Sequence, residues 1–198
     1  MTLTKAAIPL RCAAGLALAT ISPAAESPVA TLEQVTYLAY RFEPGEGWHT
    51  STSGDGGTTR LDGRVWRYDF SRGASAVRLS LPDRSLLTRP ERFRLRVRGE
   101  AKGHPVHVTL YTHFMRFHKT VGEFTGSGEQ ELVFAAPPGE GWQWSGGEND
   151  GKIHGPLRLG SISLEANGQK DAGALELLSL AVEGQCPSDK LCVMTADT

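Results

Sequence analysis

The chain has 198 residues, of which 39% are hydrophobic and 22% are charged, with 21 Lys and Arg against 22 Asp and Glu. The first 24 residues are expected to be removed as a signal peptide. Without them the chain has two fewer basic residues and the same number of acidic ones, so its net charge is about −3. This balance argues against a nucleic-acid partner or an anionic membrane partner, and the remaining length suits one domain with a sizeable core.

Residues 1–24 are predicted to be a secretory signal peptide. Lys5 and Arg11 make a basic start, and Cys12–Ile21 is an apolar run too short to span a bilayer. Small residues follow, and we expect cleavage near Ala24 or Ala25. The protein is therefore expected to be secreted or periplasmic.

A period of two dominates the rest of the chain and predicts half-buried antiparallel strands. Clusters of Gly, Pro, Asn and Asp separate these strands, and the only helix candidate, Pro28–Gln34, is short. Eight or nine strands predict an all-β fold, an antiparallel β-sandwich over residues 30–184. The clearest strands are predicted at Val35–Phe42, Val65–Phe70, Ala76–Leu81, Arg92–Arg98, Val106–Tyr111, Glu129–Phe134, Leu157–Glu165 and Ala174–Val182.

Four arginines alternate with apolar residues over Arg92–Arg98. Charged residues on the exposed face of a strand are ordinary, and their stems cover apolar surface. A binding face for acidic glycans is the alternative for this row.

Two of the four tryptophans precede this row in the chain. Trp66 alternates with Tyr68 and Phe70 and is predicted to lie in the core, whereas Trp48 is predicted either to join a ligand rim or to seal one end of the sandwich.

The strand His107–Lys119 carries the first group of candidate functional residues. Val106, Val108 and Leu110 are expected to face the core, so that His107, Thr109, Tyr111 and His113 share the opposite face. Met115 and Phe117 fall on that same face if the strand continues, and Arg116 and His118 fall on the other. This face is predicted to bind a ligand, with Tyr111 stacking on it and His107 and His113 forming hydrogen bonds to it. The alternative is that a loop covers this face and the side chains pack beneath the loop.

The segment Gly141–Leu159 is the second candidate. It is too polar and Gly-rich for a helix or a core strand, so it is predicted to be a loop. Flat rings stack on the apolar faces of sugars and short polar groups bind hydroxyls, which makes Trp142, Trp144, Asn149 and Asp150 candidate ligand-binding residues. The alternative is that both rings fold back and cap an end of the sandwich.

Two cysteines follow the last predicted strand. In an exported chain, Cys186 and Cys192 are expected to form a disulfide in a tail of residues 185–198. Closing this seven-residue loop is worth about 2.4 kcal/mol in the chain-entropy model.

Three segments, YRFEPGEGW, RFRLRVRGEAKGHPVHVTLY and LELLSLAVEG, occur in an order that resembles the galactose-binding-like jelly roll of carbohydrate-binding modules over about residues 36–184. The resemblance implies non-covalent glycan binding. It also implies a structural calcium held partly by an Asp near the end of the last strand. Leucines occupy that position here, so no cofactor is predicted, although Glu43, Asp171 and Glu176 offer oxygen ligands.

The leading hypothesis is a secreted, non-catalytic domain that binds a poly- or oligosaccharide. One alternative is a small polysaccharide lyase or glycoside hydrolase that uses His113, Tyr111 and an acidic residue of the 141–159 segment. No spacing singles out a carboxylate pair for hydrolysis, and no metal site is predicted. The other alternative is a structural or protein-binding domain of an exported assembly.

Overall fold

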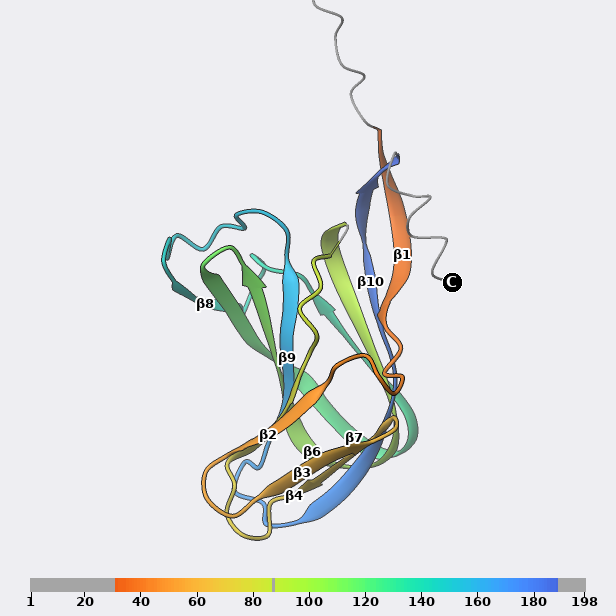
Figure 1. Cartoon of the computed structure of the whole chain (residues 1–198), viewed down its shortest axis with the longest axis vertical. Coiled ribbons are helices and arrows are strands. Elements are labelled where there is room, and N and C mark those ends of the chain that lie inside the picture. Colours follow the sequence, from red (N-terminus) through yellow and green to blue (C-terminus); the bar gives the residue numbers. More distant parts are fainter. Residues whose placement is uncertain (1–30, 87, 189–198) are drawn as a thin grey trace, which may run out of the picture.

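A computed structural model describes residues 31–86 and 88–188 (Figure 1). The predicted signal peptide and Cys192 lie outside the described residues. Within them there are ten strands and no α-helix, so the prediction of an all-β antiparallel sandwich is confirmed, with more strands than expected. The strands are β1 Leu32–Tyr40, β2 His49–Ser53, β3 Thr58–Asp62, β4 Val65–Asp69, β5 Ala76–Ser80, β6 Arg89–Thr112, β7 Met115–Ala135, β8 Gln143–Gly146, β9 Arg158–Glu165 and β10 Ala172–Pro187.

The sandwich is organised around β6 and β7, which form one long antiparallel hairpin and contribute to both layers. In the first layer β10 pairs with the first half of β6, between Arg89 and Gly99, and β4 and β3 continue the sheet beyond β10. In the second layer β9 pairs with the last part of β6, between Val106 and Tyr111, and β5 and β2 follow. At the other edge of the second layer, β8 pairs with β7.

The core lies between the two layers. Phe93, Leu95 and Val97 enter it from the first half of β6, and Val108 and Leu110 enter it from the second half; all are buried. Alternation with polar residues places one apolar side chain at every second position, which is what a half-buried strand requires. Trp66 is buried as predicted.

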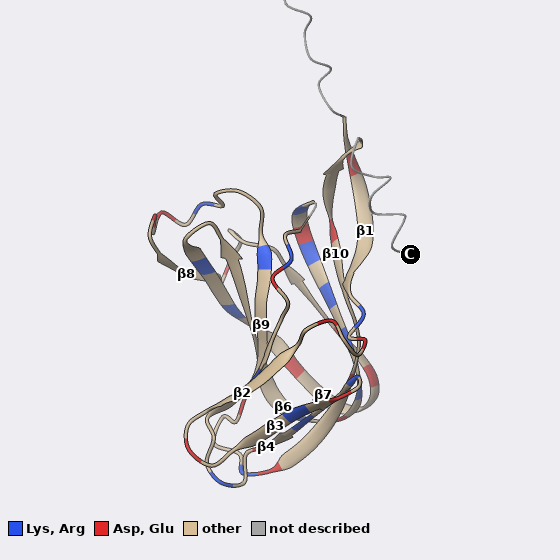
Figure 2. Cartoon of the chain, viewed as in Figure 1, with Lys and Arg blue, Asp and Glu red and all other residues tan. Residues whose placement is uncertain are grey.

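The arginine row of β6 lies on the outer face of the first layer, where blue bands cross the strand (Figure 2). Its members pair with carboxylates of the neighbouring strands: Arg94 binds Glu131 and Glu183, Arg96 binds Glu129, and Arg98 binds Glu129 and Glu176. These side chains are largely exposed, so the row is a solvated, internally neutralised surface. The pairing leaves little free positive charge there for an acidic ligand.

The predicted continuous strand His107–Lys119 is wrong, because a two-residue turn, His113–Phe114, interrupts it. Thr112 pairs with Met115 across this turn, and His113 adopts a positive φ of 44°. A two-residue turn reverses the chain and restarts the alternation of side chains. Met115 and Phe117 are consequently buried in the core, and Arg116 points outward beside its cross-strand partner Tyr111.

Other boundaries also differ from expectation. The helix candidate is wrong where it is described, because β1 begins at Leu32 and pairs with β10. Cys186 was expected beyond the last strand, but it lies within β10 and is buried; the disulfide with Cys192 stays a prediction. The described residues contain no helix that is long and apolar enough to cross a membrane.

Candidate functional site

The outward side chains of the second layer form one polar surface, which we call the His–Tyr face. Strand pairing arranges it in three rows, with neighbours in a row about 5 Å apart and rows about 7 Å apart. The three rows are Arg78, Ser163, His107 and Thr120; then Ser80, Ser161, Thr109, His118 and Gln143; and last Arg158, Tyr111, Arg116 and Ser145.

Tyr111 supplies an aromatic surface on this face. A Cβ atom at residue 160 would overlap Cε2 and lie 2.6 Å from Cδ2 of Tyr111, so one edge of the ring fills the space beside Gly160 on the neighbouring strand. The residue is 39% exposed. A partly exposed aromatic ring on a polar sheet face offers a surface on which the apolar face of a sugar stacks.

Two histidines lie beside each other on the same face, His118 one row from Tyr111 and His107 two rows from it. The ring centroids of His107 and His118 are 5.5 Å apart, and the Nδ1 atom of His107 is 3.3 Å from the Thr120 hydroxyl. Burial lowers the pKa of both side chains, and nearby Arg116 lowers it further in each case. Both imidazoles are therefore neutral at neutral pH, when each can donate one hydrogen bond and accept another.

The floor of the face is made of small residues. Ser161 and Ser163 point outward from β9 and are buried by their larger neighbours. Together with Gly160 they form a strip of small residues along β9. Tyr111 and His107 of β6 lie on one side of this strip, and β5 lies on the other. Hydroxyl groups at this position are suited to hydrogen-bonding a polyhydroxylated ligand.

Trp142 does not belong to the exposed site, and this corrects the sequence prediction. Only 4% of the residue is exposed, and its Nε1 atom donates a hydrogen bond of 3.0 Å to the carbonyl oxygen of Ala135. The ring packs within the core, which agrees with the alternative that it folds back onto the sandwich. In this position it cannot stack on a ligand.

Trp144 is 46% exposed, but it lies on the opposite side of the sheet from Tyr111. It belongs to β8, a strand within the segment predicted to be a loop, and it pairs with the buried Phe117. Directly opposed residues point to the same side of a sheet, so Trp144 points to the side of Phe117. There its indole lies against Gly151.

Asn149 and Asp150 lie in the remaining loop, residues 147–157, and its polar groups bind one another. Asp150 accepts a hydrogen bond from the backbone of Lys152 and contacts His154 at 3.0 Å. His113, at the tip of the β6–β7 hairpin, contacts Glu148 at 2.5 Å. None of these contacts joins Asp150 or Glu148 to the three rows of the His–Tyr face, and a joint site stays a prediction.

The sequence interpretation missed Arg116, His118 and Arg78. The first two were assigned to the wrong face because the turn at His113–Phe114 contains no Gly, Pro or Asn to indicate a turn. Arg78 alternates with Val77 and Leu79 in β5 and could have been recognised as outward-facing. Only the strand order shows that it lies two strands away from His107, with β9 between them.

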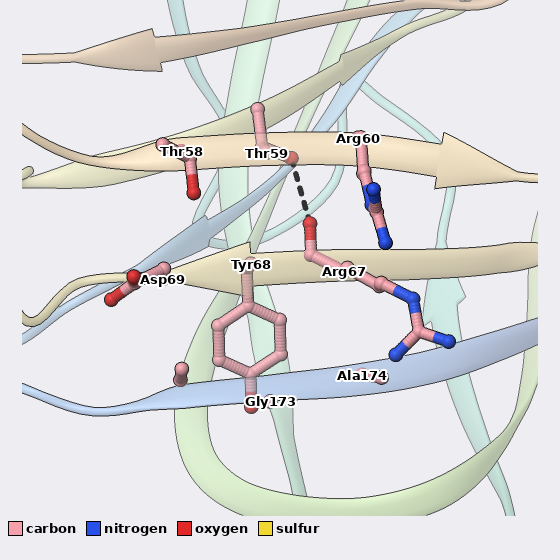
Figure 3. A pocket seen from close by; sticks show the side chains of 9 residues that line it. Thr58, Thr59, Arg60, Arg67, Tyr68, Asp69, Gly173 and Ala174 are labelled. Atoms are coloured by element: carbon pink, nitrogen blue, oxygen red, sulfur yellow. Dashed lines mark hydrogen bonds between the residues drawn. The ribbon is translucent and has the colours of Figure 1, made fainter.

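A groove of about 530 Å³ lies on the first layer, between β3, β4 and β10 (Figure 3). Its two arginines, Arg60 and Arg67, both pair with Asp62. Tyr68 lies against Gly173 and is buried, and burial raises its pKa to about 12. The groove therefore has no exposed aromatic ring and little free charge, which makes it a poorer glycan site than the His–Tyr face.

The oxygen ligands considered for calcium are occupied by cations of the chain. Glu43 pairs with Arg64, Asp171 with Lys102 and Glu176 with Arg98. In the part of the chain that the structure describes, no three His, Cys, Asp or Glu residues are grouped so as to hold a metal ion. These residues do not fit a calcium site.

No protein-family model matches the chain, and neither does any curated protein. Similar solved structures include a family 11 carbohydrate-binding module from Clostridium thermocellum in complex with a beta-1,3-1,4-mixed-linked tetrasaccharide, with a TM-score of 0.48, 12% identity and coverage of 77% of this chain and 97% of that one. A family 29 module complexed with mannohexaose has a TM-score of 0.39, 12% identity and coverage of 81% and 97%. A xylan-binding module of family 15 has a TM-score of 0.39, 11% identity and coverage of 81% and 100%. At this identity, residue roles do not transfer from these modules to the chain.

Proposed function

We propose that this protein is an exported, non-catalytic carbohydrate-binding domain and that the glycan lies on the His–Tyr face. The observation that carries the proposal is the Tyr111 ring, which is 39% exposed on this polar face and is positioned by the contact of its edge with Gly160. His118 and Ser161, one row away, and His107 and Ser163, two rows away, add donors and acceptors to the same face. An aromatic platform within a polar rim is the arrangement that binds a sugar with an apolar face and hydroxyl edges.

A Tyr111→Ala variant tests the proposal. We expect at least a tenfold loss of affinity, about 1.4 kcal/mol, for any glycan that binds the wild type on an array and in calorimetry. Phe114→Ala is the matched control, because Phe114 is an exposed aromatic residue of the adjacent turn and lies outside the face.

A Trp144→Ala variant distinguishes binding on the His–Tyr face from binding on the loop side. If Trp144→Ala abolishes binding while Tyr111→Ala does not, the glycan lies on the loop side. The absence of any glycan ligand would contradict the proposal.

A second candidate function is elimination on a uronate polysaccharide. It is supported by the cross-strand pairing of Tyr111 with Arg116, next to His118, because a lyase needs a cation at the uronate carboxylate and groups that remove and deliver protons. Incubation with polyuronates tests it through the ultraviolet absorbance of unsaturated products. If unsaturated products accumulate with the wild type and not with Tyr111→Phe, the protein is an enzyme. If the absorbance stays constant, carbohydrate binding remains the proposed function.

A further inference from the structure

The charges of the His–Tyr face differ from those of the first layer. The arginines of the β6 row and those of the groove pair with Asp or Glu side chains. Arg78 and Arg116 are also exposed, but among the described residues neither has a carboxylate within ion-pair distance. Two guanidinium groups without protein partners on one face remain available to anionic groups of a ligand.

The position of Arg116 links it to the aromatic platform. It is the direct cross-strand neighbour of Tyr111, so its guanidinium lies beside any sugar ring stacked there. Arg78 lies at the far side of the face, three strands and two rows away, a diagonal of about 20 Å. His107 and His118 lie between the two arginines. That separation matches an oligosaccharide with several rings and not a single sugar.

Apart from Asp83, which neutralises Arg158, the carboxylates near the face lie at one end of it. Glu165 is 3.9 Å from Nδ1 of His107, and Glu123 pairs with Pro105; both lie in the row beyond His107, away from Tyr111 and Arg116. Arg158, in the row of Tyr111, is neutralised by Asp83. The centre of the face therefore carries positive charge although the chain as a whole has a net charge of −1.

We propose that the glycan bound on the His–Tyr face is anionic, carrying carboxylate or sulfate groups, and that Arg116 and Arg78 are the side chains that bind those groups. This inference rests on the proposed carbohydrate-binding function and specifies its ligand. A planar guanidinium donates two parallel hydrogen bonds to a carboxylate or sulfate, and the adjacent Tyr111 ring fixes the sugar that carries it.

The experiment uses paired probes that differ in charge alone. Binding of the full chain is measured for polygalacturonate against its carboxyl-reduced form, and for dextran sulfate against dextran. We expect binding of at least one charged probe to exceed that of its neutral partner at least tenfold. We also expect the preference to weaken with added salt and to fall at least tenfold in the Arg78→Ala, Arg116→Ala double variant. Arg60→Ala, which removes an exposed arginine of the other layer, is the matched control and should bind as the wild type does.

Each outcome has a defined meaning. Preference for polygalacturonate assigns the anion as a carboxylate, and preference for dextran sulfate assigns it as a sulfate. Tyr111-dependent binding of neutral glycans without preference for charged ones would overturn this inference and leave the proposed function standing. Binding of charged probes that the double variant retains would also overturn it, because the arginines would not be the anion site. Failure to bind any probe or any arrayed glycan would remove the proposed function itself.

Discussion

At the scale of single residues, the site depends on one missing side chain. Gly160 has no Cβ atom, and for that reason the edge of the Tyr111 ring can occupy the space beside the backbone of β9. Tyrosine has few rotatable bonds, so a ring already held by this contact loses little conformational entropy when a sugar stacks on it. The aromatic surface is thus positioned before the ligand arrives.

The two histidines of the His–Tyr face are expected to make binding dependent on pH. Arg78, Arg116, His118 and Glu165 are the charged or titratable groups that face His107; Arg116 and His107 are those that face His118. Since burial and the cations lower both histidine pKa values, the imidazoles are neutral at neutral pH and gain charge as the pH falls below 6.5.

Affinity for an anionic glycan is therefore expected to rise between pH 7.5 and about pH 5, because a bound anion favours the protonated imidazole and raises its pKa. Calorimetry across this range measures the effect, together with the uptake of protons on binding. The His107→Gln, His118→Gln double variant should lose most of the pH dependence. An affinity that is constant over this range would contradict the prediction.

At the scale of elements, the β6–β7 turn and the loop of residues 147–157 hold each other. The hydrogen bond from His113 lowers the pKa of Glu148, and the backbone of Lys152 lowers the pKa of Asp150. The Thr112 hydroxyl also donates to the carbonyl of His154. This loop places Gly151 against Trp144, so the indole reports on the position of the loop.

The loop is expected to loosen in acid. A carboxyl group whose pKa is lowered by folding stabilises the folded loop above its unfolded pKa, about 4.3 for Glu, and this contribution is lost as the pH falls through the lowered value. Trp144 fluorescence should therefore be constant at pH 5 and change below about pH 4, before global unfolding is seen by circular dichroism. A Trp144→Phe variant should lack the signal. A transition at pH 6–7 would show that a histidine controls the loop instead.

At the scale of the whole molecule, β6 and β7 connect the two layers, and β10 packs closely against β6. Gly99 lies at this contact: a Cβ atom there would be 2.8 Å from the carbonyl oxygen of Ala174. Its φ of 153° is also unfavourable for other residues. The first layer therefore depends on a glycine where the two strands approach.

Gly99→Ala is expected to lower the free energy of unfolding by about 1–3 kcal/mol more than Gly103→Ala. Gly103 also has a positive φ, of 74°, but a Cβ atom there would meet nothing within 4 Å. Both glycines have a positive φ, but that of Gly99 lies farther from the left-handed region that other residues adopt, and only Gly99 has the steric contact. Urea denaturation measures both variants; equal losses would contradict the prediction.

Prediction from sequence succeeded where alternation was complete. Arg92–Arg98 and Val106–Tyr111 were recognised as strands because every second residue is apolar, and their inward residues are buried in the structure. Prediction failed for β2 and β3, which are polar strands without a clear apolar period, and for β8, a short strand in a Gly-rich segment. Their pairing with neighbouring strands determines their conformation, and a local pattern cannot show it.

The sequence by itself determined the all-β class, the core residues of the central strands and the outward facing of Tyr111 and His107, because alternation is a local property of the chain. Only the tertiary structure decided which polar residues share a face. The turn at His113–Phe114 brings Arg116 and His118 to Tyr111, whereas Trp142 is withdrawn into the core and Trp144 lies on the opposite side of the sheet. The physical reason is that one turn reverses the facing of every residue after it, and strand order determines which of those residues become neighbours.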